Sequence, residues 1–375
     1  MFGNGRNRKR ALGIAAVIAT GTLVAGHLLA QPQPRRHTAT TAGNLDLEAA
    51  TQAPIAPNRV TVTIEGDRRI IRSNSIAEHA TGPFPNAGNP NDIVAQAVEW
   101  SLPLAPEVAG QPTPYMLGTF GIAVNGVIFE PQAAEWYLGD FGSAWQYDPL
   151  GGAIPLGLDE HHAHVQPDGT YHYHGLPIGL MQELGVSPDA PSPLIGWAMD
   201  GFPIYGLYAE MDGAVVEVTS SYQLKDGGRP GGSEEPAGAY DGAFLEDWDY
   251  VAGSGDLDAC NGMRVTTAEF PQGTYAYFLT EAYPVVPRCF SGTPVAGALP
   301  QRGAGADRQA GEPQGEREAG PRGGDPLTKA AADLGVSVDA LRRAVGPPPP
   351  DFRRAARELG IDEETIRRAM RNARR

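Results

Sequence analysis

The chain has 375 residues, enough for one large domain or two smaller ones, and its 48 glycines and 34 prolines favour turns and short strands over long helices. Its net charge of −15 is unevenly placed, because residues 1–36 carry +6 and residues 326–375 carry +4, which leaves −25 on residues 37–325. This acidic central region argues against nucleic-acid binding, since contacts with phosphates need a basic surface.

The N-terminus has the pattern of an export signal. A basic segment, residues 6–10, precedes an uncharged apolar stretch, residues 11–30, which ends at the small residue Ala30 and offers a cleavage site before Gln31, although Leu28 is not ideal at the −3 position. The apolar stretch is also long enough to cross a bilayer as an uncleaved membrane anchor. We therefore expect residues 1–30 to be a signal peptide or anchor and the protein to be exported, whether periplasmic, at the cell surface or secreted. Residues 31–57, rich in Pro, Thr and Ala, are predicted to form a flexible tether.

The sequence contains two cysteines, Cys260 and Cys289. In an oxidising compartment they are expected to form one disulfide that closes a loop of about 28 residues. The alternative is a pair of buried free thiols. Their spacing does not fit a zinc knuckle.

Residues 58–292 are predicted to form one mainly β domain, a sandwich or a distorted barrel. Apolar and polar residues alternate over 60–73 around a Gly-containing turn, and Asn125-Gly126 separates two apolar runs, which is a strong hairpin signal. Helical periodicity is nearly absent, apart from short turns expected at 91–100 and 132–137.

The C-terminal part of the chain has a different pattern. Residues 293–325 are rich in Gly, Pro, Arg and Glu and are predicted to be a disordered linker. Residues 326–375 contain two copies of a helical hairpin at a 25-residue offset, with Ser337 and Asp362 as N-caps of the second helices. Their arginines indicate either a solvated surface or contact with an acidic partner, such as the acidic body or anionic lipid.

Residues 159–176 hold five of the eight histidines: His161, His162, His164, His172 and His174. On a strand, residues two apart share a face, so His172 and His174 point the same way. With a three-residue loop at 167–169, His164 lies opposite His172 and His162 opposite His174, all on one face. With a two-residue loop, His164 pairs with Tyr173 and the histidines scatter. Hairpin register therefore decides whether the histidines form a site.

Metal binding is the interpretation we favour for this cluster, over a catalytic or pH-responsive histidine network and over polar packing. Imidazoles suit zinc, copper, nickel or iron; copper or zinc is the expected ion, and the pattern does not choose between them. Asp200 is a candidate carboxylate ligand or a partner for an imidazole N–H, or else a turn residue beside glycine. Tyr171 and Tyr173 are expected to pack on the opposite face of the strand.

These residues carry a resemblance to the YHYH domain family, mostly exported and largely uncharacterised proteins named after the tetrapeptide at 171–174. The resemblance covers nearly the whole body, in the segments SNSIAEHATGPFPNAGNPN (73–91), IAVNGVIFEP (122–131), HVQPDGTYHYHGLP (164–177), MDGFPIYG (199–206), GDLDACNG (255–262) and GTYAYF (273–278). It implies a shared site at His79, His164, His172, His174 and Asp200, with less support for His161 and His162. This chain departs from the family pattern at Ser75-Ile76-Ala77, in the loop that holds His79. The resemblance supplies no established activity.

The resulting hypothesis is an exported β protein that binds a transition metal through His164, His172 and His174, with His79 reaching the site from a long loop as a fourth ligand. One alternative is a metal-dependent hydrolase or oxidoreductase, with an open coordination position and Asp200, Glu160 or Glu78 as the base. Another is a non-enzymatic interaction module of the cell envelope.

Overall fold

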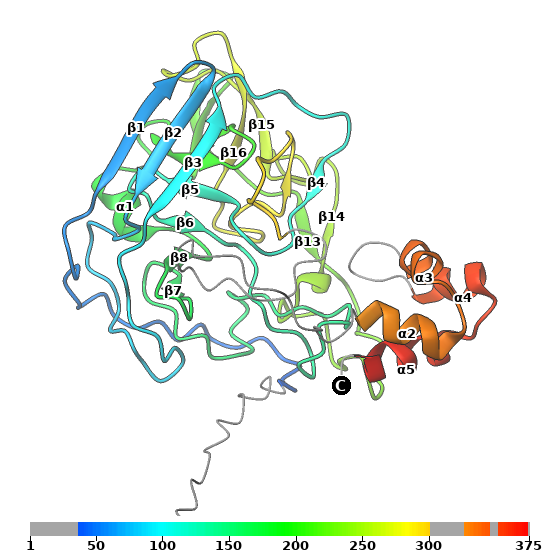
Figure 1. Ribbon diagram of the computed structural model, residues 1–375. Helices are drawn as coiled ribbons and strands as arrows, with labels where there is room; N and C mark the ends of the chain where they lie inside the picture. The colour runs from blue at the N-terminus through cyan, green and yellow to red at the C-terminus, as the bar shows by residue number, and fades with distance from the viewer. Residues whose placement is uncertain (1–36, 301–325, 346–351, 374–375) are drawn as a thin grey trace, which may run out of the picture. The chain divides into compact units, whose positions relative to one another are not determined.

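The computed structural model describes residues 37–300, 326–345 and 352–373 (Figure 1). In these ranges the protein is mainly β with a few short C-terminal helices, as predicted. A three-stranded antiparallel sheet contains β1 (Val60–Glu65), β2 (Arg68–Ser73) and β3 (Val98–Pro103). The predicted hairpin over 60–73 is confirmed, but the helical turn expected at 91–100 is wrong where β3 begins. Pairing with β2 and burial of Leu102 hold these residues extended. Both effects depend on residues outside the segment, so its own sequence does not predict the strand.

The largest sheet has eight strands: β5 (Gly121–Ala123), β6 (Ile128–Phe129), β7 (Ala163–Val165), β8 (Tyr171–Tyr173), β9 (Leu194–Ala198), β10 (Pro203–Tyr205), β15 (Gly262–Val265) and β16 (Thr274–Phe278). Their order is β15-β16-β10-β9-β5-β6-β8-β7, with parallel pairing at β10–β16 and β6–β8 and antiparallel pairing elsewhere. The end strands β15 and β7 do not pair with each other, so the sheet stays open over the described residues and does not close into a barrel.

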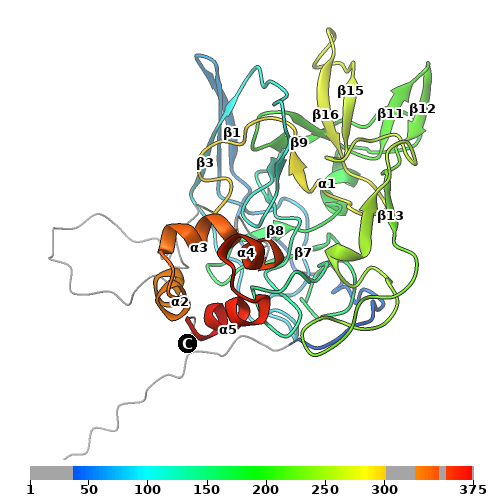
Figure 2. The ribbon, with the colours of Figure 1, turned by 90° about the vertical axis from the view of Figure 1, so that its right-hand side faces the viewer.

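The remaining strands form three short pairs: β11 (Tyr208–Met211) with β12 (Ala214–Glu217), β13 (Tyr222–Leu224) with β14 (Trp248–Tyr250), and β4 (Thr113–Pro114) with β17 (Cys289–Phe290). The body also contains a short α1 (Ile178–Glu183) and a 3₁₀ turn, η1 (Leu245–Asp247). The β11–β12 and β15–β16 hairpins lie side by side (Figure 2), where Ala209 and Met263 contribute to one apolar cluster.

The main core lies between the three-stranded and the eight-stranded sheet. Ile71 of β2 and Leu102 of β3 belong to the same cluster of buried side chains as Ile122 of β5. The sheets approach closely at the β5–β6 turn, where Gly126 has a φ of 80° and a Cβ would lie 2.1 Å from Ser73 Oγ. The hairpin predicted around this glycine is confirmed.

Residues 37–57 differ from the flexible tether that the sequence predicts over 31–57. They follow the body and form isolated β-bridges with it, for example between Glu48 and Asp159. Leu47 also packs against a second cluster of buried side chains. The partners that fix this segment come from distant parts of the chain, so its own composition does not reveal them.

Residues 293–300 belong to the body, although the sequence assigns them to the linker. The carbonyl of the buried Ala298 accepts a hydrogen bond from Thr119 N (2.8 Å), next to the start of β5. The rest of the predicted linker, residues 301–325, and the predicted signal or anchor, residues 1–30, lie outside the described residues. Within the described ranges, every helix is too short or too polar to cross a membrane.

The two cysteines form the predicted disulfide. Cys260 and Cys289 are bonded, with their Cα atoms 5.0 Å apart. The bond ties the segment before β15 to β17 at the other end of a 29-residue separation. This cross-link closes the last part of the body.

The C-terminal residues form the two predicted helical hairpins: α2 (Pro326–Leu334) with α3 (Val338–Val345), and α4 (Phe352–Leu359) with α5 (Glu363–Ala373). Ser337 Oγ accepts a hydrogen bond from Ala340 N (3.1 Å), which confirms it as the N-cap of α3. Asp362 Oδ1 accepts one from Thr365 N (3.3 Å) in the same way at α5. Side chains of all four helices meet in a core of their own.

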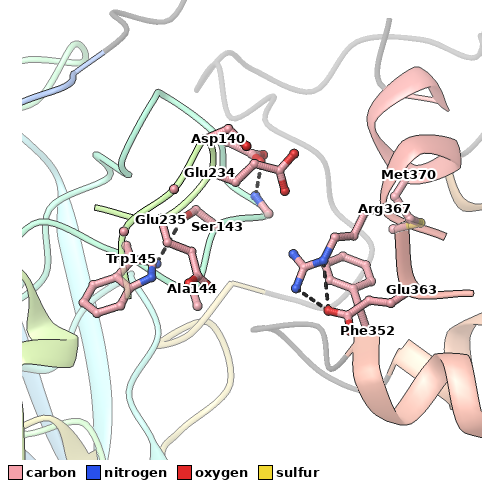
Figure 3. A pocket seen from close by; sticks show the side chains of 14 residues that line it. Asp140, Ser143, Ala144, Trp145, Glu234, Glu235, Phe352, Glu363, Arg367 and Met370 are labelled. Carbon is pink, nitrogen blue, oxygen red and sulfur yellow. Dashed lines mark hydrogen bonds and ion pairs between the residues drawn. The ribbon is translucent and has the colours of Figure 1, made fainter. Parts of the chain in front are cut away.

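One arginine of this helical module is used within the module itself. Arg367 Nη2 lies 2.8 Å from Glu363 Oε1, and its guanidinium lies over the Phe352 ring at 4.6 Å from the centroid (Figure 3). An ion pair one helical turn apart and a cation–π contact each contribute a few tenths of a kcal/mol to about 1 kcal/mol. At this position the basic side chain supports the fold of the module.

Candidate metal centre

The histidine cluster lies on the hairpin formed by β7 and β8. The strands pair antiparallel with His164 opposite His172, so the three-residue loop at 167–169 is confirmed and the two-residue alternative is wrong. Gln166 N donates to Thr170 O (2.9 Å) across the end of the loop. This register places His164 and His172 on one face of the hairpin, as the sequence predicts.

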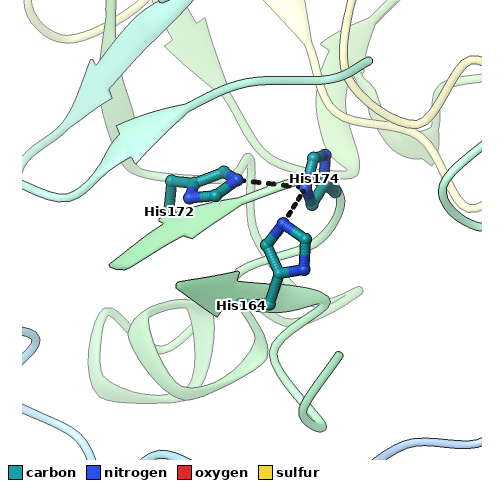
Figure 4. A group of neighbouring side chains, drawn as sticks. All are labelled: His164, His172 and His174. Atoms are coloured by element: carbon teal, nitrogen blue, oxygen red, sulfur yellow. Dashed lines mark hydrogen bonds between the residues drawn. The ribbon is translucent and has the colours of Figure 1, made fainter. Parts of the chain in front are cut away.

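Three imidazoles converge beside this hairpin (Figure 4). Nε2 of His174 lies 3.1 Å from Nε2 of His172 and 3.0 Å from Nε2 of His164. His172 and His174 are each 2% exposed, whereas His164 is half-buried. Their ligand atoms lie close enough together for the three residues to hold a single metal ion. We call His164, His172 and His174 the histidine triad.

Hydrogen bonds fix the tautomer of two rings of the triad. Nδ1 of His164 lies 2.9 Å from Leu156 O, and Nδ1 of His172 lies 3.1 Å from Thr170 O. Because a carbonyl oxygen only accepts, each Nδ1 carries the proton and each Nε2 presents a lone pair. A proton on Nε2 of His174 would serve only one of these two neighbours. A cation at the centre satisfies all three nitrogens at once.

Burial keeps the triad neutral. It lowers the pKa of His172 to about 3, and the neighbouring His164 adds to the shift. Burial also lowers the pKa of His174 well below its ordinary value, with further contributions from the other two rings and from Arg288. The pKa of His164 is lowered by burial as well. The lone pairs therefore stay available to a metal ion at neutral and mildly acidic pH.

Glu130, which the sequence analysis did not select, lies next to the triad. It follows β6, which runs parallel to β8, and its backbone N donates to Tyr173 O (2.9 Å). Its Oε2 lies 3.9 Å from His172 Nε2. Burial raises the pKa of Glu130 to about 8, although its hydrogen bond with Gln166 opposes the shift. Since burial also lowers the pKa of His172, the two groups do not form an ion pair at neutral pH.

The tyrosines of the hairpin occupy its other face, as expected. Tyr171 is buried and its hydroxyl donates to Asp159 Oδ2 (2.7 Å). The hydroxyl of Tyr173, also buried, accepts a hydrogen bond from Asn125 Nδ2 (2.9 Å). Both side chains combine apolar packing with a satisfied hydroxyl.

His79, expected as a fourth ligand, lies on this opposite face, and the structure does not bring it to the triad. Its Nδ1 donates to Ala80 O (2.7 Å) and its Nε2 accepts from the Tyr173 hydroxyl (2.7 Å). Both ring nitrogens are thus occupied. Because neighbouring residues on a strand point in opposite directions, a residue bonded to Tyr173 is separated from His172 by the strand itself.

His161 and His162 do not join the triad, and the expectation that His162 shares its face is wrong. His161 Nε2 donates to Ala80 O (2.9 Å), and its Nδ1 accepts from Gly179 N (3.0 Å). His162 has a φ of 51°, and its Nδ1 accepts from Leu176 N (3.1 Å). These two imidazoles hold neighbouring backbone in place.

Asp200, the candidate carboxylate ligand, is committed to another network. Its Oδ2 accepts hydrogen bonds from the Tyr277 hydroxyl (2.5 Å) and from Gly292 N (2.9 Å), and its Oδ1 accepts from Phe202 N (3.3 Å). It lies in the turn between β9 and β10 and is 1% exposed. The structure therefore favours the turn-residue alternative and does not bring Asp200 to the triad.

An open depression of about 770 Å³ lies on the His79 side of the hairpin, and Glu78, Glu160 and Glu183 help to line it. Glu160 Oε2 accepts a hydrogen bond from Ala50 N (2.9 Å). The pKa of Glu78 is raised by burial and by the neighbouring Glu183. Glu78 and Glu160, proposed from the sequence as bases beside a metal, thus lie on the face of the hairpin that the triad does not use.

The fold and the site define a mainly β protein with three converging histidines on one hairpin of an open mixed sheet. Comparison with protein families identifies it further, because the YHYH protein family matches residues 99–292, just over half of the chain. The chain therefore belongs to the YHYH protein family, and the resemblance drawn from its motifs is confirmed. The matched region contains the triad and Glu130, whereas His79 precedes it. Comparisons with curated proteins and with solved structures give no match.

Proposed function

We propose that this protein binds one divalent transition metal ion, copper or zinc, through Nε2 of His164, His172 and His174. The observation that carries the proposal is the convergence of the three Nε2 atoms, with successive separations of 3.1 and 3.0 Å, while backbone carbonyls hold two of the Nδ1 protons. Orientation of the second ring nitrogen by a carbonyl is typical of metal-binding histidines.

The spacing of the triad fits a tetrahedral metal ion. With zinc–nitrogen distances of about 2.0–2.1 Å, two imidazole ligands at a tetrahedral angle lie about 3.3 Å apart. The two separations from His174 are a few tenths of an ångström shorter, and the ligand atoms of all three rings lie within 4.8 Å of one another. Small side-chain movements therefore suffice to admit the ion. Because folding has already brought the ligands together, little further conformational entropy is lost when the ion binds.

A metal-dependent hydrolase or oxidoreductase is the second candidate function. Three imidazoles are a ligand set used by catalytic zinc, which keeps a fourth position open to water or substrate. The half-buried His164 is the observation that favours access to this centre from solvent. An enzyme predicts that an exogenous ligand such as azide enters the coordination sphere, whereas a closed binding module predicts an unchanged metal spectrum.

We also propose that the body acts outside the cytoplasm. The basic and apolar segments at 6–10 and 11–30 support export, and the bond between Cys260 and Cys289 is consistent with an oxidising compartment. Mass spectrometry of the protein from its native host distinguishes the two forms of the N-terminus. A mature chain starting at Gln31 indicates a cleaved signal, and an intact N-terminus in the membrane fraction indicates an anchor.

Elemental analysis tests the metal site. The untagged full-length chain is stripped with a chelator, incubated with zinc or copper and desalted before the metal is counted. We expect about one ion per chain for the wild type and for His162→Ala, a matched control beside the triad, and little metal for His172→Ala and His174→Ala. A wild-type protein that stays metal-free with both ions, or variants that bind as the wild type does, contradicts the proposal.

A further inference from the structure

We infer that Glu130 is the fourth ligand of the metal ion, so that the centre consists of three imidazoles and one carboxylate. This inference rests on the proposed metal site and adds a residue that neither the hairpin nor its spacing supplies. It is carried by two observations on Glu130, its distance from the triad and its fixed orientation, and by the negative charge that its carboxylate supplies to a bound cation.

Sheet pairing brings Glu130 to the triad. β6 runs parallel to β8 with Ile128 beside His172, so Glu130, two residues further along, projects from the same side of the sheet. Its Oε2 lies 3.9 Å from His172 Nε2. A fourth tetrahedral ligand lies about 3.3 Å from each of the other three. Glu130 Oε2 therefore has to approach His172 Nε2 by about 0.6 Å and to move closer to the other two rings as well, which a change in the torsion angles of this side chain can provide.

Gln166 orients the carboxylate. Its Nε2 donates to Glu130 Oε2, the oxygen that faces His172. Gln166 directly follows β7 and precedes the loop at 167–169, so the hairpin that holds the triad also positions the fourth group. A hydrogen bond of this kind to a ligating carboxylate is the usual outer support of a metal site.

Charge balance gives the same assignment. Three neutral imidazoles bring no negative charge, and a buried dication is costly unless an anion compensates it. The Glu130 side chain is 14% exposed, and among the described residues its carboxylate is the only one within 4 Å of a triad nitrogen. An ionised Glu130 reduces the charge of a divalent centre to +1.

The assignment also specifies what the centre can hold. A set of imidazoles and one carboxylate, without thiolate or thioether, favours Zn²⁺ or Cu²⁺ over Cu⁺. Four protein ligands fill a tetrahedral site, which is typical of metal holding and structural support and leaves no position for a substrate. The inference therefore predicts a closed binding centre instead of a hydrolytic or redox active site.

Cobalt(II) titration of the full-length chain tests this assignment. Affinity is measured by competition with a chromophoric chelator, and coordination is followed in the visible spectrum. We expect Glu130→Gln to raise the dissociation constant at least about 10-fold and to change the d–d bands. The control Glu135→Gln alters another carboxyl whose pKa is raised by burial, and it should leave both the affinity and the spectrum unchanged.

The outcomes separate this inference from the proposed function. A wild type that binds one Co²⁺ while Glu130→Gln keeps its spectrum, with or without a loss of affinity, removes Glu130 from the ligand set and leaves the triad in place. A wild type that binds no metal removes both. If Glu130→Gln fails to fold, the crystal structure of the zinc-loaded wild type decides, because a ligating Glu130 oxygen must lie within about 2.2 Å of the ion.

Discussion

Two backbone carbonyls determine the chemistry of the histidine triad at the scale of single residues. The carbonyls of Leu156 and Thr170 hold the Nδ1 protons of His164 and His172, so both Nε2 lone pairs turn toward His174. Burial then disfavours a proton on any of the three rings. The combination presents electron pairs to a cation and suppresses competition from protons.

Replacing His172 with glutamine should make the metal-free protein less sensitive to acid. In the unfolded chain His172 binds a proton near its ordinary pKa of about 6.5, whereas burial lowers its pKa to about 3 in the folded chain. Below about pH 6.5 the unfolded state therefore binds more protons, and stability falls by up to about 1.4 kcal/mol per pH unit from this residue.

Urea unfolding of the wild type and of His172→Gln at pH 7, 6 and 5 measures this difference. Glu130, whose pKa is raised to about 8, contributes a change of opposite sign over the same range, but it is present in both proteins. Parallel losses of stability in the two proteins would show that His172 is protonated in the folded chain.

Replacing Tyr173 with phenylalanine should separate the two faces of the hairpin. The change leaves His79 Nε2 and Asn125 Nδ2 without their buried partner, which should cost about 1–3 kcal/mol of stability. Losing a residue that supports a metal ligand typically lowers metal affinity by about 10- to 100-fold. Tyr173 lies on the other face of the hairpin, so its replacement should change metal affinity by less than about 10-fold. Chemical unfolding and metal titration of this variant check both statements, and a selective loss of metal binding would place Tyr173 in the metal site.

At the scale of elements, the loop of the β7–β8 hairpin sets the register on which the site depends. Gly169 has a φ of 89°, and a Cβ there would lie 2.5 Å from Val94 Cβ. Gly213, in the β11–β12 turn, has a φ of 77° but nothing within 4 Å of the same position. The two glycines thus share a backbone conformation and differ in their surroundings.

Gly169→Ala should destabilise the protein more than Gly213→Ala and should also weaken metal binding. In both variants, an L-residue in the left-handed region should lower the free energy of unfolding by about 1–2 kcal/mol. In Gly169→Ala the new Cβ also clashes with Val94, which should lower the free energy of unfolding by about 1–3 kcal/mol more and disturb the register of His164. Thermal unfolding and metal titration of the pair measure this; equal effects of the two changes would show that the loop does not control the site.

Local turn signals predicted the hairpins, and with them most of the candidate site. The alternation over 60–73, the Asn125-Gly126 pair and the loop at 167–169 each specify contacts between neighbours in sequence, and each prediction is confirmed. The sequence did not predict Glu130 as a site residue, because Glu130 reaches the triad through the parallel pairing of β6 with β8. The sequence contains no short-range signal for such a pairing. His79 was assigned to the metal by family resemblance alone, and its bond to Tyr173 depends on the path of a long irregular loop.

At the scale of the whole molecule, the chain contains a body and a helical module with separate apolar cores. The cluster formed by Leu341, Phe352 and Ile366 with their neighbours draws only on α2 to α5. The clusters of the body draw only on residues before 300. The change of periodicity in the sequence predicts this division. The predicted limits of the body, residues 58 and 292, are too narrow, because residues 37–57 and 293–300 also pack against it.

Deleting residues 326–375 should leave metal binding unchanged. The hydrogen bonds and close contacts described for the triad and Glu130 are with residues of the body, so the truncated protein should bind about one ion with an affinity within a few-fold of the wild type. Metal titration of the two proteins measures this. A large loss of affinity would indicate that the helical module contributes to the metal site.

Anomalous diffraction from crystals soaked with zinc or copper tests the central claim most directly. Data on either side of the metal absorption edge locate the ion independently of any assumption about its ligands. We predict one strong peak about 2.0–2.1 Å from Nε2 of each of His164, His172 and His174. A peak beside His79 and His161, or no peak at the triad in crystals that contain the metal elsewhere, would contradict it.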